Sequence, residues 1–257
     1  MEFYGDYHMH TKYSDGRATV ADMVEAARLK GLAEVGIADH GPANMGTGVK
    51  NNNTYLKIKE ETKYLASHFP QLKIKVSAEA DIVGLKGELD ISKRIIEELD
   101  YLLVGLHPYV IPIDFGTAWN YVLGNQLVKI KKGLREKVKN INTKSLIDTL
   151  YKHDVLAVTH PGLKMDIDYQ ELAKVCVKTD TALEINTGHT FPKVDDILLI
   201  ADSGVNFIVN SDAHFPETVG EFDYGRYVLN KAKITEERVL NAVKKVGEWA
   251  SGRVGEK

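Results

Sequence analysis

Short runs of apolar residues recur along the chain, and in the segments between them apolar residues follow helical spacing. Runs such as LLVGL, VLAVT and NFIVN are almost continuously apolar, which is typical of strands buried on both faces of a parallel sheet. We predict seven strands from these runs, at residues 3–8, 34–38, 73–78, 101–106, 155–159, 182–186 and 206–210.

The segments between the strands predict helices. In TVADMVEAARLK, Val20, Val24 and Ala27 recur at helical spacing after Thr19, a residue type that commonly caps a helix. The predicted helices cover residues 19–30, 53–68, 90–99, 144–152, 168–178, 194–203 and 235–249. Residues 108–142 interrupt the alternation, and we predict that they form an irregular insertion followed by a helix.

The alternation of strands and helices determines the expected fold class. It continues without a linker rich in Pro, Gly or Ser, which indicates a single α/β domain over residues 1–257. The right-handed crossover rule leaves two architectures, an open doubly wound sheet and a closed barrel. A length of 257 residues is close to the roughly 250 of a typical (β/α) barrel, so we expect the barrel.

Composition narrows the class of protein and its partners. The chain is 44% hydrophobic and 27% charged with a formal net charge of −3, a mix typical of globular domains. This charge does not favour nucleic acid as a partner but leaves it open. The one cysteine, Cys176, excludes an intrachain disulfide and a cysteine-rich metal site, and it fits a cytoplasmic location. We find neither a long apolar run that predicts a membrane span nor the pattern of a signal peptide.

Residues that bind divalent metals stand at the ends of the predicted strands. The strands run into HMH, IADHG, EAD, GLHP, THP and NSDAH, which supply His8, His10, His40, Glu79, His107, His160, Asp212 and His214. Asp15 follows in the loop after the first strand, and the sixth strand ends in Glu184 and Asn186 with His189 just beyond. Parallel strands of a barrel all end at one face, where active sites lie. We therefore predict that the nine potential ligands converge on one mouth.

The types of these residues indicate the metal chemistry. His8 and His10 are two apart at a strand end, so both imidazoles can face one ion. Imidazole and carboxylate without thiolate suit Zn, Mn or Fe, and also Co or Ni. Nine ligands exceed the three that hold a simple catalytic zinc, so we predict two to three divalent ions with Glu79 or another carboxylate as a bridge. The remaining histidines, His68 and His153, are interpreted as structural.

The motifs HMHTKYSDG, IADHG, EAD, GLHP, THPG and NSDAH, in this order, resemble those of the PHP (polymerase and histidinol phosphatase) phosphoesterase family. The match covers residues 6–214, and EADIVGLKGELD is similar to the stand-alone bacterial and archaeal phosphatase branch. The resemblance implies a distorted seven-stranded (β/α) barrel of the TIM type and a trinuclear metal site. It assigns His8, His10, Glu79 and Asp212 to one ion, Glu79, His107 and His160 to a second, and Asp15, His40 and His214 to a third.

The expected chemistry is phosphoester hydrolysis. Three divalent ions carry more positive charge than Asp15, Glu79 and Asp212 neutralise, so the centre would attract a phosphate dianion. We predict attack by a metal-bridging hydroxide on a phosphate monoester of a small molecule, with Glu79 as a catalytic metal ligand and His189 as the general acid. The predicted substrate contacts are Arg17, Arg226, Asn44 and His189.

Other functions remain open at this point. The same centre suits a histidinol-phosphate phosphatase specifically, or a nuclease or phosphodiesterase acting on nucleic acid, although the basic groove with stacking aromatic residues that single strands require is not evident. An amidohydrolase-type hydrolase also uses His-x-His and a late Asp, and a metal-dependent binding domain is the non-enzymatic alternative. We expect no membrane partner, and the sequence does not indicate an oligomeric state.

Overall fold

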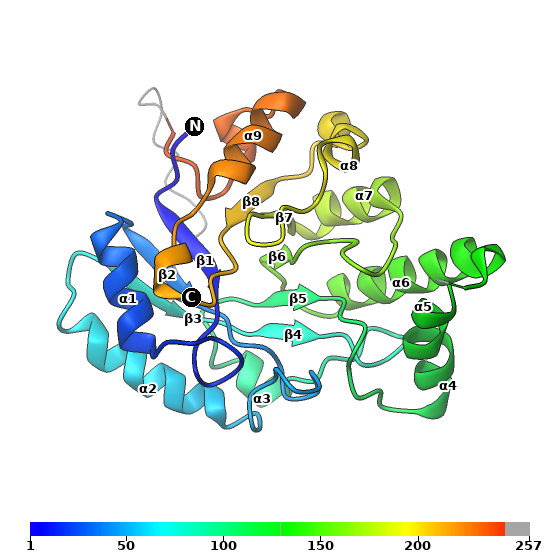
Figure 1. The fold of residues 1–257 in the computed structure, drawn as a ribbon, viewed down its shortest axis with the longest axis horizontal. Helices are drawn as coiled ribbons and strands as arrows, with labels where there is room; N and C mark the ends of the chain where they lie inside the picture. Colours follow the sequence, from blue (N-terminus) through cyan, green and yellow to red (C-terminus); the bar gives the residue numbers. More distant parts are fainter. Residues whose placement is uncertain (129, 245–257) are drawn as a thin grey trace.

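The computed structural model describes residues 1–128 and 130–244, and its strands lie at the centre with helices around them (Figure 1). The strands are β1 (Gly5–Met9), β2 (Glu34–Ile37), β3 (Lys73–Val76), β4 (Glu79–Asp81), β5 (Leu103–Gly105), β6 (Ala157–Val158), β7 (Ala182–Asn186) and β8 (Phe207–Asn210). They form two sheets, in the orders β1–β2–β3 and β4–β5–β6–β7–β8. Every pair within these sheets is parallel, which confirms the α/β class with parallel sheets.

The strand predicted at residues 73–78 is divided into two in the structure. β3 pairs with β2, whereas β4 begins at Glu79 and pairs with β5. The chain changes its sheet partner between Val76 and Glu79, and the described residues therefore contain eight strands where seven were predicted. The division matters for the site, because it places Glu79 at the first residue of a new strand.

Two isolated parallel bridges join the sheets to each other. One pairs Met9, at the end of β1, with Ala213 beyond β8, and the other pairs His40 beyond β2 with Glu79 of β4. The backbone N–H of His10 also donates to the carbonyl of Ala213 (2.9 Å). The first connection lies at the carboxyl ends of β1 and β8, and the second joins the carboxyl end of β2 to the first residue of β4. These connections hold the two sheets together.

The helices described are α1 (Val20–Leu29), α2 (Thr54–Ala66), α3 (Lys93–Ile96), α4 (Phe115–Thr117), α5 (Gly124–Leu127), α6 (Arg135–Leu150), α7 (Tyr169–Thr179), α8 (Val194–Leu198) and α9 (Asp223–Ala232). α1 shows why the prediction at residues 19–30 is confirmed. Thr19 and Asp22 form a capping box, and Val20, Met23, Val24 and Ala27 are buried. None of the described helices is long and apolar enough to cross a membrane.

Two helix predictions are wrong over most of their length. Only Lys93–Ile96 of the segment 90–99 is helical, because the Asp90 carboxylate binds the backbone N–H groups of Ala43 and Asp81 and holds its own segment as a loop. Of the segment 235–249, residues 245–249 lie outside the described part. Residues 235–244 contain a 3-10 turn, Glu236–Arg238. The chain after this turn pairs with β8 through an isolated parallel bridge between Val239 and Phe207.

One helix was not predicted. α9 buries Gly225, Val228, Leu229 and Ala232 along one side. This spacing is helical, but the buried positions include a glycine and an alanine, so the apolar signal is weak. α9 ends at Lys233, which adopts a left-handed conformation (φ 56°).

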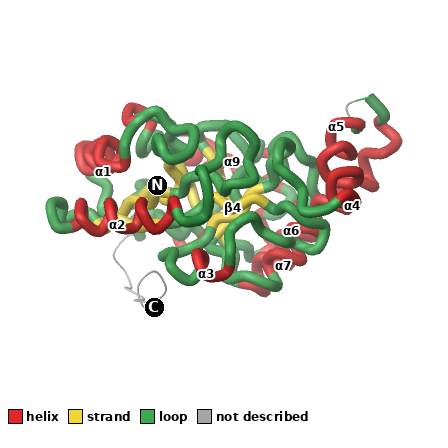
Figure 2. The backbone as a smooth tube through the Cα atoms, turned by 90° about the horizontal axis from the view of Figure 1, so that it is seen from below, coloured by secondary structure: helices red, strands yellow, loops and turns green. Residues whose placement is uncertain are grey.

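The insertion at residues 108–142 is more regular than predicted. After an isolated bridge between Val110 and Asn44 it contains α4, a π-helical turn (Ala118–Leu123), α5, and a short 3-10 turn that leads into α6. The predicted helix at residues 144–152 is the second half of α6. Figure 2 shows α4 and α5 at one end of the molecule, beyond α6 and α7.

The buried apolar residues form two clusters, and the smaller one indicates where the site lies. It comprises Tyr7, Ala38, Leu103, Ala157, Ala182 and Ile208, which come from six different strands or the residues directly after them. Two to four residues further along most of these strands, the buried side chains become polar. An apolar layer is therefore followed by a polar layer toward the carboxyl ends of the strands.

Candidate metal centre

The polar layer brings together all nine residues that the sequence predicts as metal ligands. His8 lies in β1 and Glu79 starts β4, while the other members follow strand ends or occupy the loop after β1: His10, Asp15, His40, His107, His160, Asp212 and His214. They form overlapping groups whose ligand atoms lie within a few ångströms of one another.

The first group consists of His8, His10, Glu79 and Asp212. The Nε2 atoms of His8 and His10 are 3.1 Å apart, and they lie 3.3 and 3.6 Å from Glu79 Oε2. Asp212 Oδ1 is 3.0 Å from His10 Nε2 and 3.7 Å from His8 Nε2. Glu79 Oε2 and Asp212 Oδ1 are buried without a hydrogen-bond partner, which is costly unless a cation satisfies them. These atoms fit a divalent ion.

Glu79 also faces a second group of imidazoles. Its Oε1 lies 2.8 Å from His160 Nε2 and 3.5 Å from His107 Nε2, and these two nitrogens are 3.3 Å apart. The same oxygen accepts a hydrogen bond from the Thr159 hydroxyl (2.7 Å). Each carboxylate oxygen of Glu79 therefore points to a different set of histidines, as a bridging ligand requires.

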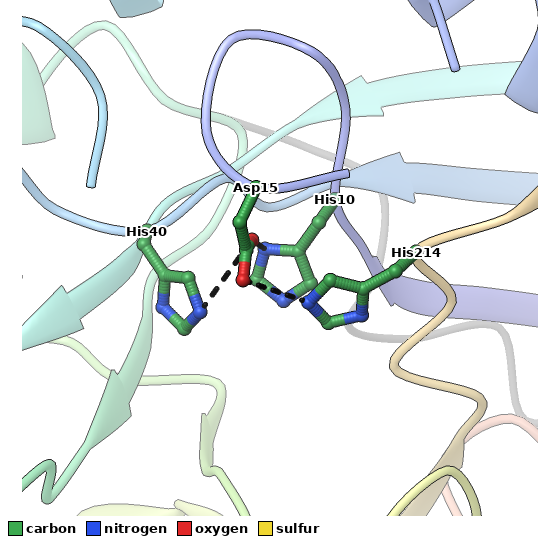
Figure 3. A group of neighbouring side chains, drawn as sticks. All are labelled: His10, Asp15, His40 and His214. Atoms are coloured by element: carbon green, nitrogen blue, oxygen red, sulfur yellow. Dashed lines mark ion pairs between the residues drawn. The ribbon is translucent and has the colours of Figure 1, made fainter. Parts of the chain in front are cut away.

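The third group surrounds Asp15 (Figure 3). Asp15 Oδ2 is 3.2 Å from His214 Nε2, and Oδ1 is 3.8 Å from His40 Nε2. His10 Nδ1 lies 3.9 Å from the same Oδ1 and has no hydrogen-bond partner. The structure thus places His10 between the first and third groups. His40 Nδ1 contacts Glu79 Oε2 (2.8 Å), so His40 connects the third group to the bridging carboxylate.

A tight loop holds Asp15 in this position. The buried Asp39 carboxylate accepts the backbone N–H and the hydroxyl of Thr11, both at 2.7 Å, and the hydroxyl of Ser14. The loop then turns back on itself at Gly16, where an added Cβ would lie 2.3 Å from the carbonyl oxygen of His10. Asp39 directly precedes His40 in the IADHG motif, but its residue type and position did not indicate this role.

Two further carboxylates, those of Glu184 and Asp81, orient histidines by contacting their Nδ1 atoms. Glu184 Oε1 lies 2.7 Å from His8 Nδ1, and Asp81 Oδ1 lies 2.5 Å from His107 Nδ1. Such pairs fix the tautomer so that Nε2 is free to bind a metal. The sequence indicated Glu184 only as a polar strand end, and it missed Asp81, although the EAD motif contains it.

In the centre, the carboxylates and the histidines shift each other's pKa values. Burial alone would raise the pKa of Glu79, but the nearby histidines, His8 first among them, hold that pKa well below its ordinary value. For His40, burial acts against the charged form, yet Glu79 and other carboxylates raise its pKa to about 9. Burial and the charge of His40 lower the pKa of His10 to about 4. His10 is therefore neutral near pH 7, whereas His40 is protonated and would have to release its proton to bind a metal.

Three of the four residues predicted to contact the substrate lie next to the candidate metal centre. His189 is half-exposed at the edge of the centre, with Nε2 3.4 Å from Asp212 Oδ2. Asn44 is buried, with its amide 3.4 Å from Asp81 Oδ1 and 3.5 Å from His40 Nδ1. Arg17 is exposed, and its backbone N–H donates to the carbonyl of His214 (2.8 Å). These three adjoin the centre.

Arg226 does not join the centre. It lies on α9, where it pairs with Asp223 (2.6 Å), and its guanidinium lies over the ring of Phe3, before the start of β1. His68 also lies apart, bonded to the carbonyl of Tyr64 at the end of α2, and His153 lies between α6 and β6. Neither belongs to the metal-ligating groups of the described residues.

Comparison with known proteins gives a family match over most of the chain. The model of the PHP domain matches residues 6–248. A probable phosphatase of Enterobacter sp. (strain 638) is 28% identical over 250 residues, which are 92% of this chain and 89% of the relative. The probable phosphatase YcdX of Escherichia coli O81 (strain ED1a) is 28% identical over 251 residues, with the same coverage.

Two solved structures share the fold. The histidinol phosphate phosphatase HisK of Lactococcus lactis, complexed with Zn, L-histidinol and phosphate, has a TM-score of 0.61 and 18% identity over 90% of this chain and 94% of its own. The putative histidinol phosphatase HisK of Listeria monocytogenes has a TM-score of 0.63 and 19% identity, covering 87% of this chain and 99% of its own.

Proposed function

Because the chain belongs to the PHP family, we propose that it is a metal-dependent phosphoesterase that hydrolyses the phosphate monoester of a small molecule. The observation that carries this proposal is the set of six histidines, four of them buried, that gather around Glu79, Asp212 and Asp15 at the carboxyl ends of the strands. The relatives named as probable phosphatases support the same class of reaction.

Two to three divalent ions, Zn, Mn or Fe, are the proposed cofactors. His8, His10, Glu79 and Asp212 would hold the first, Glu79, His107 and His160 the second, and Asp15, His40 and His214 the third. Ions bound there would supply Lewis-acid chemistry, by polarising the phosphoryl group and activating water. The protein's own part is to fix His8 through Glu184 and His107 through Asp81, and to keep the side chains of His8, His10 and Glu79 buried.

The proposed scaffold is a distorted seven-stranded barrel that forms one domain over residues 1–257. In this seven-stranded description, β3 and β4 are taken as one interrupted strand. The bridges Met9–Ala213 and His40–Glu79 support closure of the two sheets into a barrel. Such closure explains how ligands from residue 8 to residue 214 meet at one mouth.

On the substrate side we propose His189 as the general acid and Asn44 as a residue that orients His40. His189 is exposed enough to meet a leaving group, and its backbone N–H is held by Asn186 Oδ1 (2.9 Å). We also propose that Arg17, whose backbone N–H donates to the carbonyl of His214, binds a phosphate oxygen. Arg226 is left out, because its guanidinium is paired with Asp223 on α9.

The substrate is proposed as a small phosphomonoester, and histidinol phosphate is one member of that class. L-histidinol and phosphate are bound in the Lactococcus structure, which makes this compound a reasonable first test. The net charge of −3 gives no support to a nucleic-acid substrate.

A substrate panel tests the proposal. Protein loaded separately with Zn, Mn or Fe is assayed on p-nitrophenyl phosphate, bis-p-nitrophenyl phosphate, histidinol phosphate and single-stranded DNA. We expect the highest kcat/KM on a monoester. Cleavage confined to the diester or to DNA would overturn the monoester proposal, and elemental analysis that finds less than one ion per chain would overturn the metal centre.

A further inference from the structure

The helical arm formed by α4, the π-helical turn and α5 exposes a row of large apolar side chains. Phe115 is 80% exposed, Trp119 57% and Ile130 82%, and Leu123 is also exposed. Phe115, Trp119 and Leu123 are four residues apart, so they follow one side of the helix. The rings of Phe115 and Trp119 stack with centroids 6.3 Å apart. We call Phe115, Trp119, Leu123 and Ile130 the apolar stripe.

The opposite side of the same arm is already used for packing. Thr117, Tyr121, Gly124 and Asn125 are buried there, and the Asn125 amide exchanges two hydrogen bonds of 2.9 Å with Asn142 of α6. A helix on the surface of a monomer presents one apolar face to the body and a polar face to water. Here the covered face is largely polar, and the opposite face carries large apolar side chains that the described residues leave exposed.

The exposed area is large for a monomer. A covered aromatic side chain buries about 150–250 Å², so Phe115 and Trp119 together leave roughly 250–300 Å² of apolar surface. With Leu123, Ile130 and the neighbouring exposed Ile111 and Ile113, the total reaches roughly 600 Å², at the upper end of what monomers expose. A standard interface buries about 800 Å² per partner, a little over half of it apolar. The stripe together with Ile111 and Ile113 therefore has the apolar area that one side of such an interface needs.

We propose that the apolar stripe is the interface between two copies of this chain, which pair their arms in antiparallel orientation about a twofold axis. The charges at the ends of the stripe favour this partner. Asp114 stands at its start, and the exposed Lys131 and Lys132 stand at its end. In an antiparallel pair, the acidic end of each arm lies beside the basic end of the other. A twofold interface is self-complementary in this way.

The axis of the pair passes close to Leu123, which is near the middle of the span from Phe115 to Ile130. The arm lies at one end of the molecule (Figures 1 and 2), so the bodies of the two copies do not obstruct the contact. None of the nine proposed metal ligands belongs to the stripe. Its substitution therefore leaves metal content and the basal activity unchanged, and a failed dimer test does not bear on the proposed function.

Mass in solution tests the proposal. Sedimentation velocity and light scattering on the full chain between 1 and 100 µM should give twice the chain mass of 28.6 kDa. Phe115→Ser with Trp119→Ser should raise the dimer dissociation constant at least 100-fold. The matched control is Leu29→Ser with Leu198→Ser, which replaces two exposed apolar residues on other helices and should leave the dimer intact. A monomeric wild-type chain at 100 µM, or a double variant that still dimerises, would overturn the proposal.

Two further variants cover the possibility that the serine variant unfolds. Lys131→Glu with Lys132→Glu should weaken the dimer at least tenfold at low salt, since like charges would then face each other. Leu123→Cys should give a disulfide-linked dimer on oxidation, whereas Leu29→Cys should not. Cys176 does not compete, because it is buried and burial raises the pKa of its thiol to about 12. Absence of both effects would contradict the antiparallel arrangement.

Discussion

Glu79 is the residue on which the two deeper metal-ligating groups depend. Its Oε2 faces His8, His10 and His40, and its Oε1 faces His107 and His160. Five imidazoles around one carboxylate account for the depressed pKa of Glu79, and they make it the natural bridge between ions.

We therefore expect Glu79→Gln to lose at least one ion per chain and at least 100-fold in kcat, because the loss of an outer ligand partner already costs about 10–100-fold and Glu79 is proposed as a direct ligand. Elemental analysis and steady-state kinetics measure the two effects. Glu221→Gln, at a surface pair with Lys30, is the control and should match the wild type. Full metal content in Glu79→Gln would show that the ligand assignment is wrong.

Asp90 provides a pH-dependent test at the scale of one residue. Burial, with the charge of Asp81 second, raises the pKa of Asp90 to about 8, whereas an unfolded Asp titrates near 4. Between these values the folded chain binds more protons than the unfolded chain, so this residue's contribution to stability falls as the pH rises from about 4 to about 8.

Asp90→Asn lacks this titration, so the stability of the wild type relative to the variant should decrease by the order of a few kcal/mol between pH 5 and pH 8. Urea unfolding of chelator-treated protein at pH 5, 6.5 and 8 measures the difference without linked metal binding. The exposed residue Asp195, as Asp195→Asn, is the control. A difference that stays constant with pH would refute the prediction.

At the scale of elements, the loop after β1 shows how a backbone constraint positions a ligand. Asp39 binds Thr11 and Ser14, and Gly16 packs against the carbonyl of His10. A side chain at Gly16 has no room, since the nearest atoms belong to the backbone and cannot rotate away.

Gly16→Ala should therefore displace Asp15 and lower the occupancy of the third metal position, with at least a tenfold loss of kcat. Elemental analysis and kinetics at limiting metal measure these effects, and circular dichroism should show an unchanged fold. Gly133→Ala is the matched control, because no atom lies within 4 Å of a Cβ at Gly133. Equal metal content and activity in the two variants would contradict this account of the loop.

The sequence predicted the elements that repeat a strong local pattern and missed those set by distant contacts. The continuous apolar runs located the strands, and the residues directly after them are the ones that converge, because strand direction alone carries those residues to one face. The division of residues 73–78 depends on a change of sheet partner, which no local pattern encodes. The loop at Asp90 depends on the backbone N–H groups of Ala43 and Asp81, which are 47 and 9 residues away.

The same distinction applies to the site. Asp39, Asp81 and Glu184 act through hydrogen bonds to other side chains or to the backbone, so their residue type did not reveal their role. Arg226 had a suitable type and position in the sequence, but α9 directs it to Asp223. Residue type predicts what a group can do, and the packing of its element decides whether it reaches the centre.

At the scale of the whole molecule, the metal centre joins segments that are far apart in the chain. Its ligands run from His8 to His214 and come from both sheets, and the described residues join those sheets through Met9–Ala213 and His40–Glu79. Bound ions would therefore act as crosslinks between strand ends whose buried carboxylate oxygens otherwise have no hydrogen-bond partner.

Removing the metal should consequently destabilise the entire fold. A ligand present at about 1,000 times its dissociation constant contributes about 4 kcal/mol per site to folding, and each kcal/mol shifts Tm by about 2–4 °C in a chain of this size. We expect Tm to fall by at least about 8 °C when EDTA strips the Zn-loaded protein, as measured by scanning calorimetry. EDTA already saturated with Zn is the control and should leave Tm unchanged, as should EDTA added to Glu79→Gln that has lost its ions. Equal Tm values for the stripped and the loaded protein would contradict this prediction. They would show that the bound ions do not stabilise the fold and do not crosslink the two sheets.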